Sequence, residues 1–151
     1  MKDLDFIKDK ELRSTLENSI EYMYALFEQS KDGEKNLLYK EETYRVIILY
    51  VISTIEAILL YFYKERKENI ERIEYKFVTT LPEDYKHQKK NNLPVIVAVQ
   101  EKIQKKEHEI GLYDLVNLFQ GKKLIIEQTA KDILELNDIR NTFHMSKPRE
   151  N

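Results

Sequence analysis

The feature that most constrains the fold of this chain is a long apolar run at residues 46–63. Apart from its tyrosines, only Ser53, Thr54 and Glu56 interrupt the hydrophobic side chains. A run of this length lies at the lower limit for a membrane-spanning helix. A central bundle helix that its neighbours wrap on most sides has the same composition. Because Glu56 would cost roughly 3 kcal/mol at the middle of a bilayer and no second run exists, we expect a buried helix and no membrane partner.

Composition indicates a helical domain without cysteine. Only three Gly and three Pro occur among 151 residues, of which 34% are charged, and this balance favours long helices with few turns. The length is usual for one domain, so we predict a single domain over residues 1–151. The lack of Cys excludes disulfides, thiol nucleophiles and cysteine-ligated metals. The net charge of −2 gives no general attraction to phosphate, so binding of nucleic acid would depend on a local basic patch.

Hydrophobic spacing predicts most of the helices. A third helix is expected because Ile96, Val99 and Ile103 would share one of its faces. The start of the last helix is predicted from a capping box of Thr129 and Asp132. The predicted helices cover residues 5–30, 41–69, 94–111 and 112–120, the last of these closed by Gly121, and a final one runs from just after Thr129 to Pro148.

Residues 70–93 differ from the rest of the chain. In their first part, Ile73, Tyr75 and Phe77 alternate with charged residues, which is a strand-like pattern. We interpret the segment as a small irregular insertion between bundle helices. It also contains a basic cluster, Tyr85-Lys86-His87-Gln88-Lys89-Lys90, which could bind phosphates and stack a base. A solvated loop is the more usual meaning of such a run.

Residue types suited to chemistry gather in order at only one place, Asn137-Asp138-Ile139-Arg140-Asn141-Thr142-Phe143-His144. On a helix, Arg140 and His144 stand one above the other, because four residues make about one turn. Asn137, seven residues before His144, projects in nearly the same direction. This face is otherwise apolar, and an unpaired buried guanidinium is costly. The face should therefore open onto a pocket or a partner, unless Arg140 pairs with a carboxylate such as Glu56.

This stretch resembles the motif of the HEPN superfamily, in which an Arg and a polar residue, often Asn, precede a His near the end of the last main helix. Arg140-Asn141 and His144 match in type and order. The Arg-to-His spacing is shorter than the usual four to six residues, and a shift of one residue turns the imidazole by roughly 100° around the helix. The resemblance implies an all-α fold, an antiparallel bundle of four to five helices interrupted by the insertion at 70–93. It also implies that the helix holding residues 46–63 lines a dimer interface.

The resemblance further implies a metal-independent endoribonuclease of toxin or phage-defence type, which cleaves RNA through attack of a ribose 2′-hydroxyl on its own phosphodiester. His144 would transfer protons and Arg140 would bind the phosphate. Asn141 would hold the scissile phosphate or fix a ring tautomer. Asn137 and Glu56 would support the site. Because one chain supplies only one such His, a two-fold homodimer would bring two.

The alternative is a non-catalytic HEPN-like module that binds a nucleotide or nucleic acid, or only dimerises, so the sequence leaves open whether the chain is an enzyme. The enzyme requires Arg140 and His144 to face a shared cleft that solvent can reach, whereas the module predicts a closed ion pair. RNA or a nucleotide, a second copy of the chain and a cognate antitoxin are the expected partners.

No cofactor or metal site is expected. The sequence has no glycine loop that would cradle a phosphate, and neither His87 nor His108 has a second ligand at metal-binding spacing. The first residues lack the basic-then-apolar layout of a signal peptide, so we expect a cytoplasmic protein.

Overall fold

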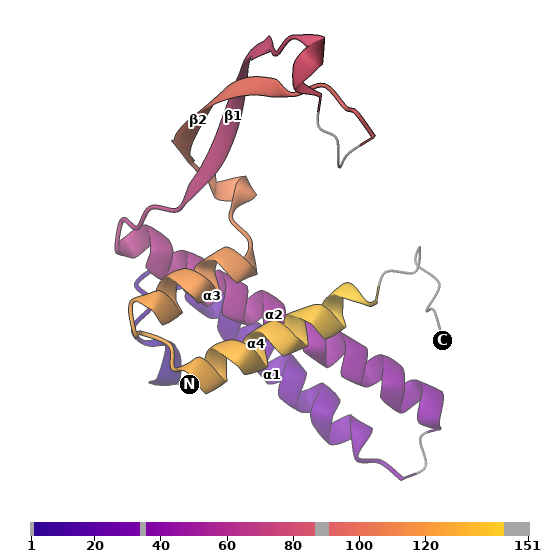
Figure 1. Cartoon of the computed structure of the whole chain (residues 1–151). Helices are drawn as coiled ribbons and strands as arrows, with labels where there is room; N and C mark the ends of the chain where they lie inside the picture. The colour runs from indigo at the N-terminus through magenta and orange to yellow at the C-terminus, as the bar shows by residue number, and fades with distance from the viewer. Residues whose placement is uncertain (1, 34–35, 87–90, 144–151) are drawn as a thin grey trace. The chain divides into compact units, whose positions relative to one another are not determined.

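The computed structural model describes residues 2–33, 36–86 and 91–143, and its chain forms two compact units (Figure 1). The helical unit comprises Met1–Glu68 and Gly111–Asn151, and the hairpin unit comprises Asn69–Ile110. Whether the two units fold as one domain, as the sequence predicts, stays a prediction.

The helical unit begins with a helical hairpin of α1 (Lys10–Ser30) and α2 (Leu37–Glu65), which lie side by side (Figure 1). The Asp9 carboxylate accepts hydrogen bonds of 3.0 Å from two backbone N–H groups of the first turn of α1. The Asn36 side chain caps α2 in the same way, at 2.8 Å from the N–H of Tyr39. These caps satisfy otherwise unpaired amides. Both predicted helices are confirmed, with α1 starting later and α2 starting earlier than the apolar spacing alone indicated.

The other two helices, α3 (Leu112–Gly121) and α4 (Glu127–Asn141), pack against α2 and against each other. The predicted short helix is therefore confirmed as α3. The predicted start of the last helix was wrong, because α4 begins before Thr129 and the Gln128 side chain, not a capped backbone amide, hydrogen-bonds Asp132 at 2.8 Å. The most deeply buried side chains of this unit come from the N-terminal segment, α2 and α3: Ile7, Ile52, Leu115 and Val116.

The end of α2 is closed by a left-handed residue and tied to the end of α3. Lys67 has a φ of 51°, and the next residue, Glu68, donates its N–H to the carbonyl of Tyr63 at 3.0 Å. The Glu68 carboxylate accepts a hydrogen bond from Lys122, the C-cap residue of α3, and also pairs with Arg66 at 3.3 Å. The hydrogen bond from Lys122 is the main reason why the pKa of Glu68 is lowered.

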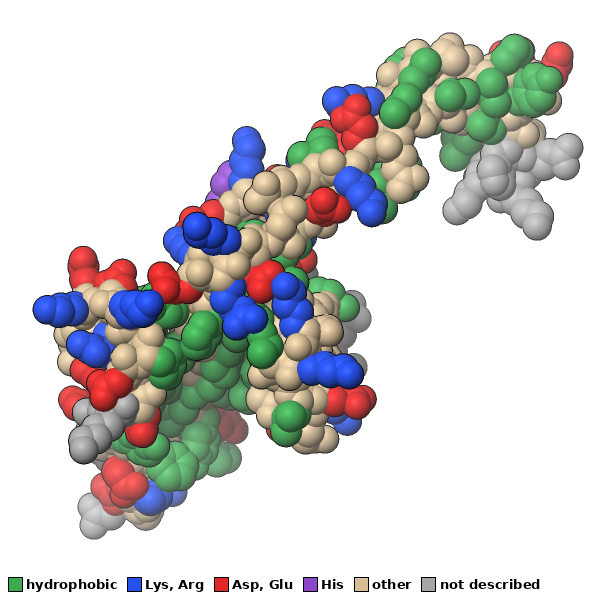
Figure 2. All heavy atoms as spheres, turned by 90° about the vertical axis from the view of Figure 1, so that its left-hand side faces the viewer, with side chains coloured by type: hydrophobic (Ala, Val, Ile, Leu, Met, Phe, Trp, Pro, Cys, Tyr) green, Lys and Arg blue, Asp and Glu red, His purple; other side chains and the backbone are tan. Residues whose placement is uncertain are grey.

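Helix α2 is less covered than the sequence indicated. It is the one helix in the described part of the chain that is long and apolar enough to cross a membrane, yet only 17% of its apolar window is buried. The prediction that neighbours wrap this helix on most sides was wrong for the single chain, since Leu49 and Tyr50 remain 41% and 37% exposed. Figure 2 shows hydrophobic side chains at the surface of both units.

The hairpin unit is an antiparallel ribbon of β1 (Glu71–Thr80) and β2 (Ile96–Gln104), with short 3-10 helices at Glu83–Tyr85 and Glu107–Glu109. The fold is therefore mixed, with α-helices and a β-hairpin, and the prediction of an all-α bundle was wrong. The irregular insertion predicted at 70–93 is instead the first strand and turn of this ribbon, whose second strand lies beyond it.

The predicted third helix was wrong because β2 occupies its residues. Ile96, Val99 and Ile103 have the spacing of a helical face, but a three-residue pattern is a weak signal in a short segment. The segment is rich in β-branched residues, which pack well on a pleated ribbon and are stiff in helices. Pairing with β1 then decided the conformation.

Candidate functional site

The candidate site is centred on Arg140, in the last turn of α4, and Glu56, near the middle of α2. The Arg140 Nη1 atom lies 3.4 Å from the Glu56 Oε2 atom, in an ion pair whose side chains are 27% and 34% exposed. The contact is a single one, so the other N–H groups of the guanidinium are not used in it. The structure thus brings together two of the five residues predicted for the site, across the interface of α2 and α4.

Asn137, one turn before Arg140 on α4, contributes a buried polar atom. Its side-chain oxygen is inaccessible to solvent and has no hydrogen-bond partner among the described residues. A buried amide oxygen without a hydrogen-bond donor costs free energy, so a donor from water or from a ligand would be stabilising at this position. The predicted supporting role of Asn137 stays a prediction, and this orphaned oxygen is the observation that bears on it.

A second arginine, which the sequence analysis did not select, lies beside the end of α4. The Arg45 guanidinium carbon is 5.7 Å from the centre of the Phe143 ring, in a cation–π arrangement, and the same side chain pairs with Glu42. Arg45 precedes Glu56 by eleven residues, about three helical turns, and so lies on the same side of α2. That spacing is the signal in the sequence that would have identified it.

Two further residues were predicted for the site, Asn141 and His144. Asn141 is the last residue of α4 and is exposed. His144, the predicted proton-transfer group, lies outside the described residues. The helix ends at Asn141, before Pro148, and the Thr142 hydroxyl donates a hydrogen bond of 2.7 Å to the carbonyl of Ile139. Arg140 is therefore helical, whereas the chain has left the helix before it reaches His144.

The predicted basic cluster belongs to the hairpin unit. The prediction that the protein has no metal site concerns the whole chain. Tyr85 and Lys86 are exposed, whereas residues 87–90 lie outside the described part of the structure. Within the described ranges, no group of three or more His, Asp or Glu side chains is placed to hold a metal ion.

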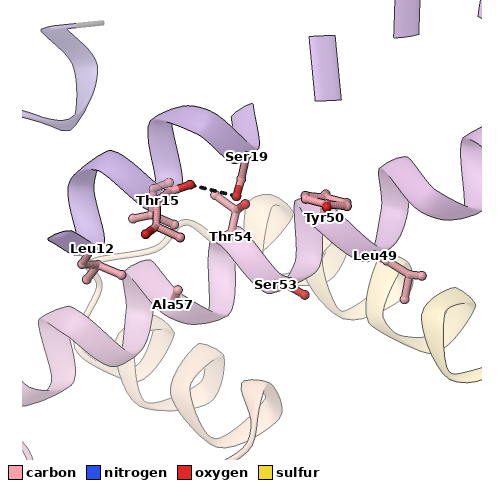
Figure 3. Close-up of a pocket in the computed structure, with 9 residues that line it drawn as sticks. Leu12, Thr15, Ser19, Leu49, Tyr50, Ser53, Thr54 and Ala57 are labelled. Carbon is pink, nitrogen blue, oxygen red and sulfur yellow. Dashed lines mark hydrogen bonds between the residues drawn. The ribbon is translucent and has the colours of Figure 1, made fainter. Parts of the chain in front are cut away.

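A shallow groove of about 270 Å³ runs between α1 and α2 (Figure 3). The Ser19 hydroxyl in this groove donates a hydrogen bond of 2.9 Å to the Thr15 carbonyl. Its lining contains no Asp, Glu, Lys, Arg or His, so the groove offers neither phosphate binding nor proton transfer by such groups. It is suited to receive apolar surface. The lining residues are Leu12, Thr15, Leu16, Ser19, Leu49, Tyr50, Ser53, Thr54 and Ala57.

Comparison of this chain with protein-family models, with curated proteins and with solved structures found no match. The assignment of a function therefore depends on the residues and contacts described above.

Proposed function

We propose that this protein is a metal-independent endoribonuclease of toxin or phage-defence type, acting through Arg140, Asn141 and His144. The observation that carries the proposal is that the ion pair between Arg140 and Glu56 is partly exposed, with side chains 27% and 34% accessible, and is therefore not the closed pair that the non-catalytic module predicts. Glu56 fixes the direction of the guanidinium while leaving N–H groups for phosphate oxygens. His144 follows within four residues and supplies the base or the acid for 2′-hydroxyl attack.

Arg45 supports this proposal as a second cation near the end of α4. Its contact with the Phe143 ring places a positive charge next to the residue that precedes His144 along the chain. A crowded phosphorane carries extra negative charge in the transition state, and fixed cations stabilise it. Two arginines from different helices would act on that charge more strongly than one.

The proposed enzyme is a soluble cytoplasmic homodimer. An exposed apolar surface on α2, with the groove of Figure 3 beside it, supports self-association, because monomers rarely leave such surfaces uncovered. A dimer would also supply the second His144 that paired acid and base catalysis needs. RNA is the proposed substrate, and a cognate antitoxin is a candidate regulatory partner.

An RNA-cleavage assay tests this proposal. Purified wild type and the variants Arg140→Ala and His144→Ala are incubated with a mixed-sequence RNA. His108→Ala is the matched control, since His108 is an exposed histidine of the hairpin unit with no assigned role. We expect loss of cleavage in the first two variants and wild-type cleavage in the control. Equal cleavage by His144→Ala and wild type would contradict the proposal.

The second candidate function is a non-catalytic module that binds a nucleotide or nucleic acid. The same ion pair favours it in one respect, because Glu56 neutralises much of the Arg140 charge. The two functions separate in a binding experiment: the module binds RNA or nucleotide without cleaving it, and Arg140→Ala weakens that binding. For the module, Glu56→Gln should strengthen binding, since it removes the carboxylate that pairs with Arg140.

A further inference from the structure

The hairpin unit exposes several large apolar side chains on both of its strands, among them Tyr75, Phe77 and Val99. A lone hairpin is marginally stable in water, and three or more strands with a hydrophobic face are generally needed. The outer edge of β1 has no strand partner in the described part of the chain, because the sheet contains β1 and β2 alone. Unpaired N–H and C=O groups along such an edge are a template for another strand.

The two faces of the ribbon differ in character. One face carries Ile73, Tyr75 and Phe77 in a row, with side chains 51%, 66% and 63% exposed. The register places Phe77 opposite Ala98, whereas Tyr75 and Ile73 lie opposite Gln100 and Lys102, so on this face the apolar row is confined to β1 apart from Ala98. The row is regular until the bulge that follows Phe77. The regular apolar row therefore extends over residues 73–77 and ends at the bulge.

On the opposite face, β1 carries the charged residues Arg72, Glu74 and Lys76, which lie opposite Ile103, Glu101 and Val99 of β2. Glu74 lies directly opposite Glu101, and like charges in that position destabilise a strand pair. The Nζ atom of Lys76 pairs with Glu101 at 2.6 Å, but the nearest cation to Glu74 is Arg72, at 3.8 Å in the same strand. A cation placed on the open side of Glu74 would relieve the repulsion.

We propose that the outer edge of β1 pairs with β1 of a second copy of this chain, antiparallel and centred on Tyr75. In that register Tyr75 faces its own counterpart, and Ile73 lies opposite Phe77 of the second copy. Glu74 lies opposite Lys76 of the second copy, which adds a second cation to the Arg72 that Glu74 already pairs with. The sequence of residues 73–77 is therefore complementary to itself in apolar character and in charge.

Two other registers are disfavoured by the same charges. A pairing centred on Glu74 would set the two copies of that carboxylate against each other and Arg72 against Lys76. Self-pairing of β2 about Glu101 would likewise oppose identical charges. Charged residues on an edge normally prevent pairing of strands. On β1 their order gives attractive pairs in the register centred on Tyr75, and also in one centred on Ile73, where Arg72 lies opposite Glu74. Cross-linking at position 75 or at position 73 distinguishes the two registers.

The resulting sheet has four strands and a continuous apolar stripe made by both copies. This contact is independent of the ribonuclease proposal, since it uses none of the residues assigned to catalysis. It is also distinct from the apolar surface of α2. Both contacts are isologous, so one dimer can hold both only about a common two-fold axis.

A cysteine cross-link tests the register, because the natural sequence has no Cys. Residues directly opposite in an antiparallel pair have Cα atoms about 4.5–5.5 Å apart, within the range of a disulfide. In full-length protein, Tyr75→Cys should therefore form an intermolecular disulfide under mild oxidation. Ile73→Cys is the matched control, since two such residues would lie about 13 Å apart along the strands. Cross-linking of Ile73→Cys at the same rate, or of neither variant, would overturn the proposal.

Charge reversal on the Tyr75→Cys background tests the attractive pairs. We expect Glu74→Lys to lower the initial cross-linking rate about tenfold, because it opposes two lysines at both symmetric positions. Glu74→Lys combined with Lys76→Glu should restore the rate to within about threefold. Glu83→Lys, the same charge change outside the strand, should leave it unchanged. Failure of the combined variant to restore the rate would contradict self-pairing, and circular dichroism of each variant shows whether the hairpin still forms.

Discussion

Removing both members of the Arg140–Glu56 ion pair, singly and together, measures how much of this contact is structural. The variants are Arg140→Ala, Glu56→Ala and the double variant. Their free energies of unfolding give the coupling between the two side chains, separate from the other contacts that each one makes. A functional Arg140 should contribute little to folding, whereas a structural one should contribute much.

The expected coupling is small because the contact is neither close nor buried. One Nη1–Oε2 distance of 3.4 Å joins side chains that are 27% and 34% exposed. Exposed ion pairs contribute about 0.2–1 kcal/mol, so we expect a coupling of about 0.5–1 kcal/mol. Arg140 also lies in the last turn of α4, where a cation gains about 0.3–1 kcal/mol from the helix dipole. Together these contributions give a cost of about 1–2 kcal/mol for Arg140→Ala.

Urea unfolding followed by circular dichroism provides the measurement, with the same slope expected for all variants. Ile52→Ala is the control for loss of a structural side chain. Ile52 is fully buried on α2, the helix that carries Glu56, so this substitution should cost about 2–5 kcal/mol in free energy of unfolding. Phe143 is only half-buried under Arg45, so Phe143→Ala should cost less than Ile52→Ala. A coupling above about 2 kcal/mol, or unfolding of Arg140→Ala, would refute the argument, since a guanidinium that the fold requires is a buried structural partner.

Three further predictions follow from the proposed chemistry, the exposed α2 surface and the charge pairs. Cleavage should survive EDTA, because the proposed mechanism uses no metal ion. It should leave 2′,3′-cyclic phosphate ends, because the 2′-hydroxyl is the nucleophile. Products with 3′-hydroxyl ends, identified by mass spectrometry, would exclude this mechanism. The protein should be a dimer at micromolar concentration without detergent, and light scattering that gives a monomer mass, or extraction that needs detergent, would count against it. The pKa of Glu68 is lowered in the fold, so its stabilising effect is present above the unfolded pKa and is lost as the pH falls through the folded value. The difference in melting temperature between wild type and Glu68→Gln should therefore shrink from pH 7 to pH 3, and a constant difference would show that Lys122 does not stabilise the charged form.

Local sequence patterns predicted those helices of the helical unit in which a long apolar repeat was followed by a residue that ends a helix. The helices now seen as α1, α2 and α3 follow from such patterns, and Gly121 lies at the end of α3 as expected. The exact starts of α1 and α2 depended on Asp9 and Asn36, whose capping oxygens were not used in the prediction. The start of α4 was misplaced because a capping box is a short motif that also occurs inside helices.

The candidate site was predicted in part. The suggestion that Arg140 pairs with Glu56 came from the cost of burying a lone cation, and the two side chains do meet. Arg45 was missed because its contact with Phe143 joins residues far apart in the sequence. The catalytic roles of Arg140, Asn141 and His144 stay predictions.

The sequence by itself determined what depends on neighbours along the chain: helix periodicity, caps, the absence of thiols and the clustering of polar residues at 137–144. Tertiary structure alone decided that residues 96–104 form a strand, because a β-strand obtains its hydrogen bonds from a partner strand and not from itself. It also decided how much of α2 stays exposed, since burial depends on how many helices reach its surface. Burial of an apolar side chain is favourable, but the side chain does not determine which part of the molecule, or which second copy, buries it.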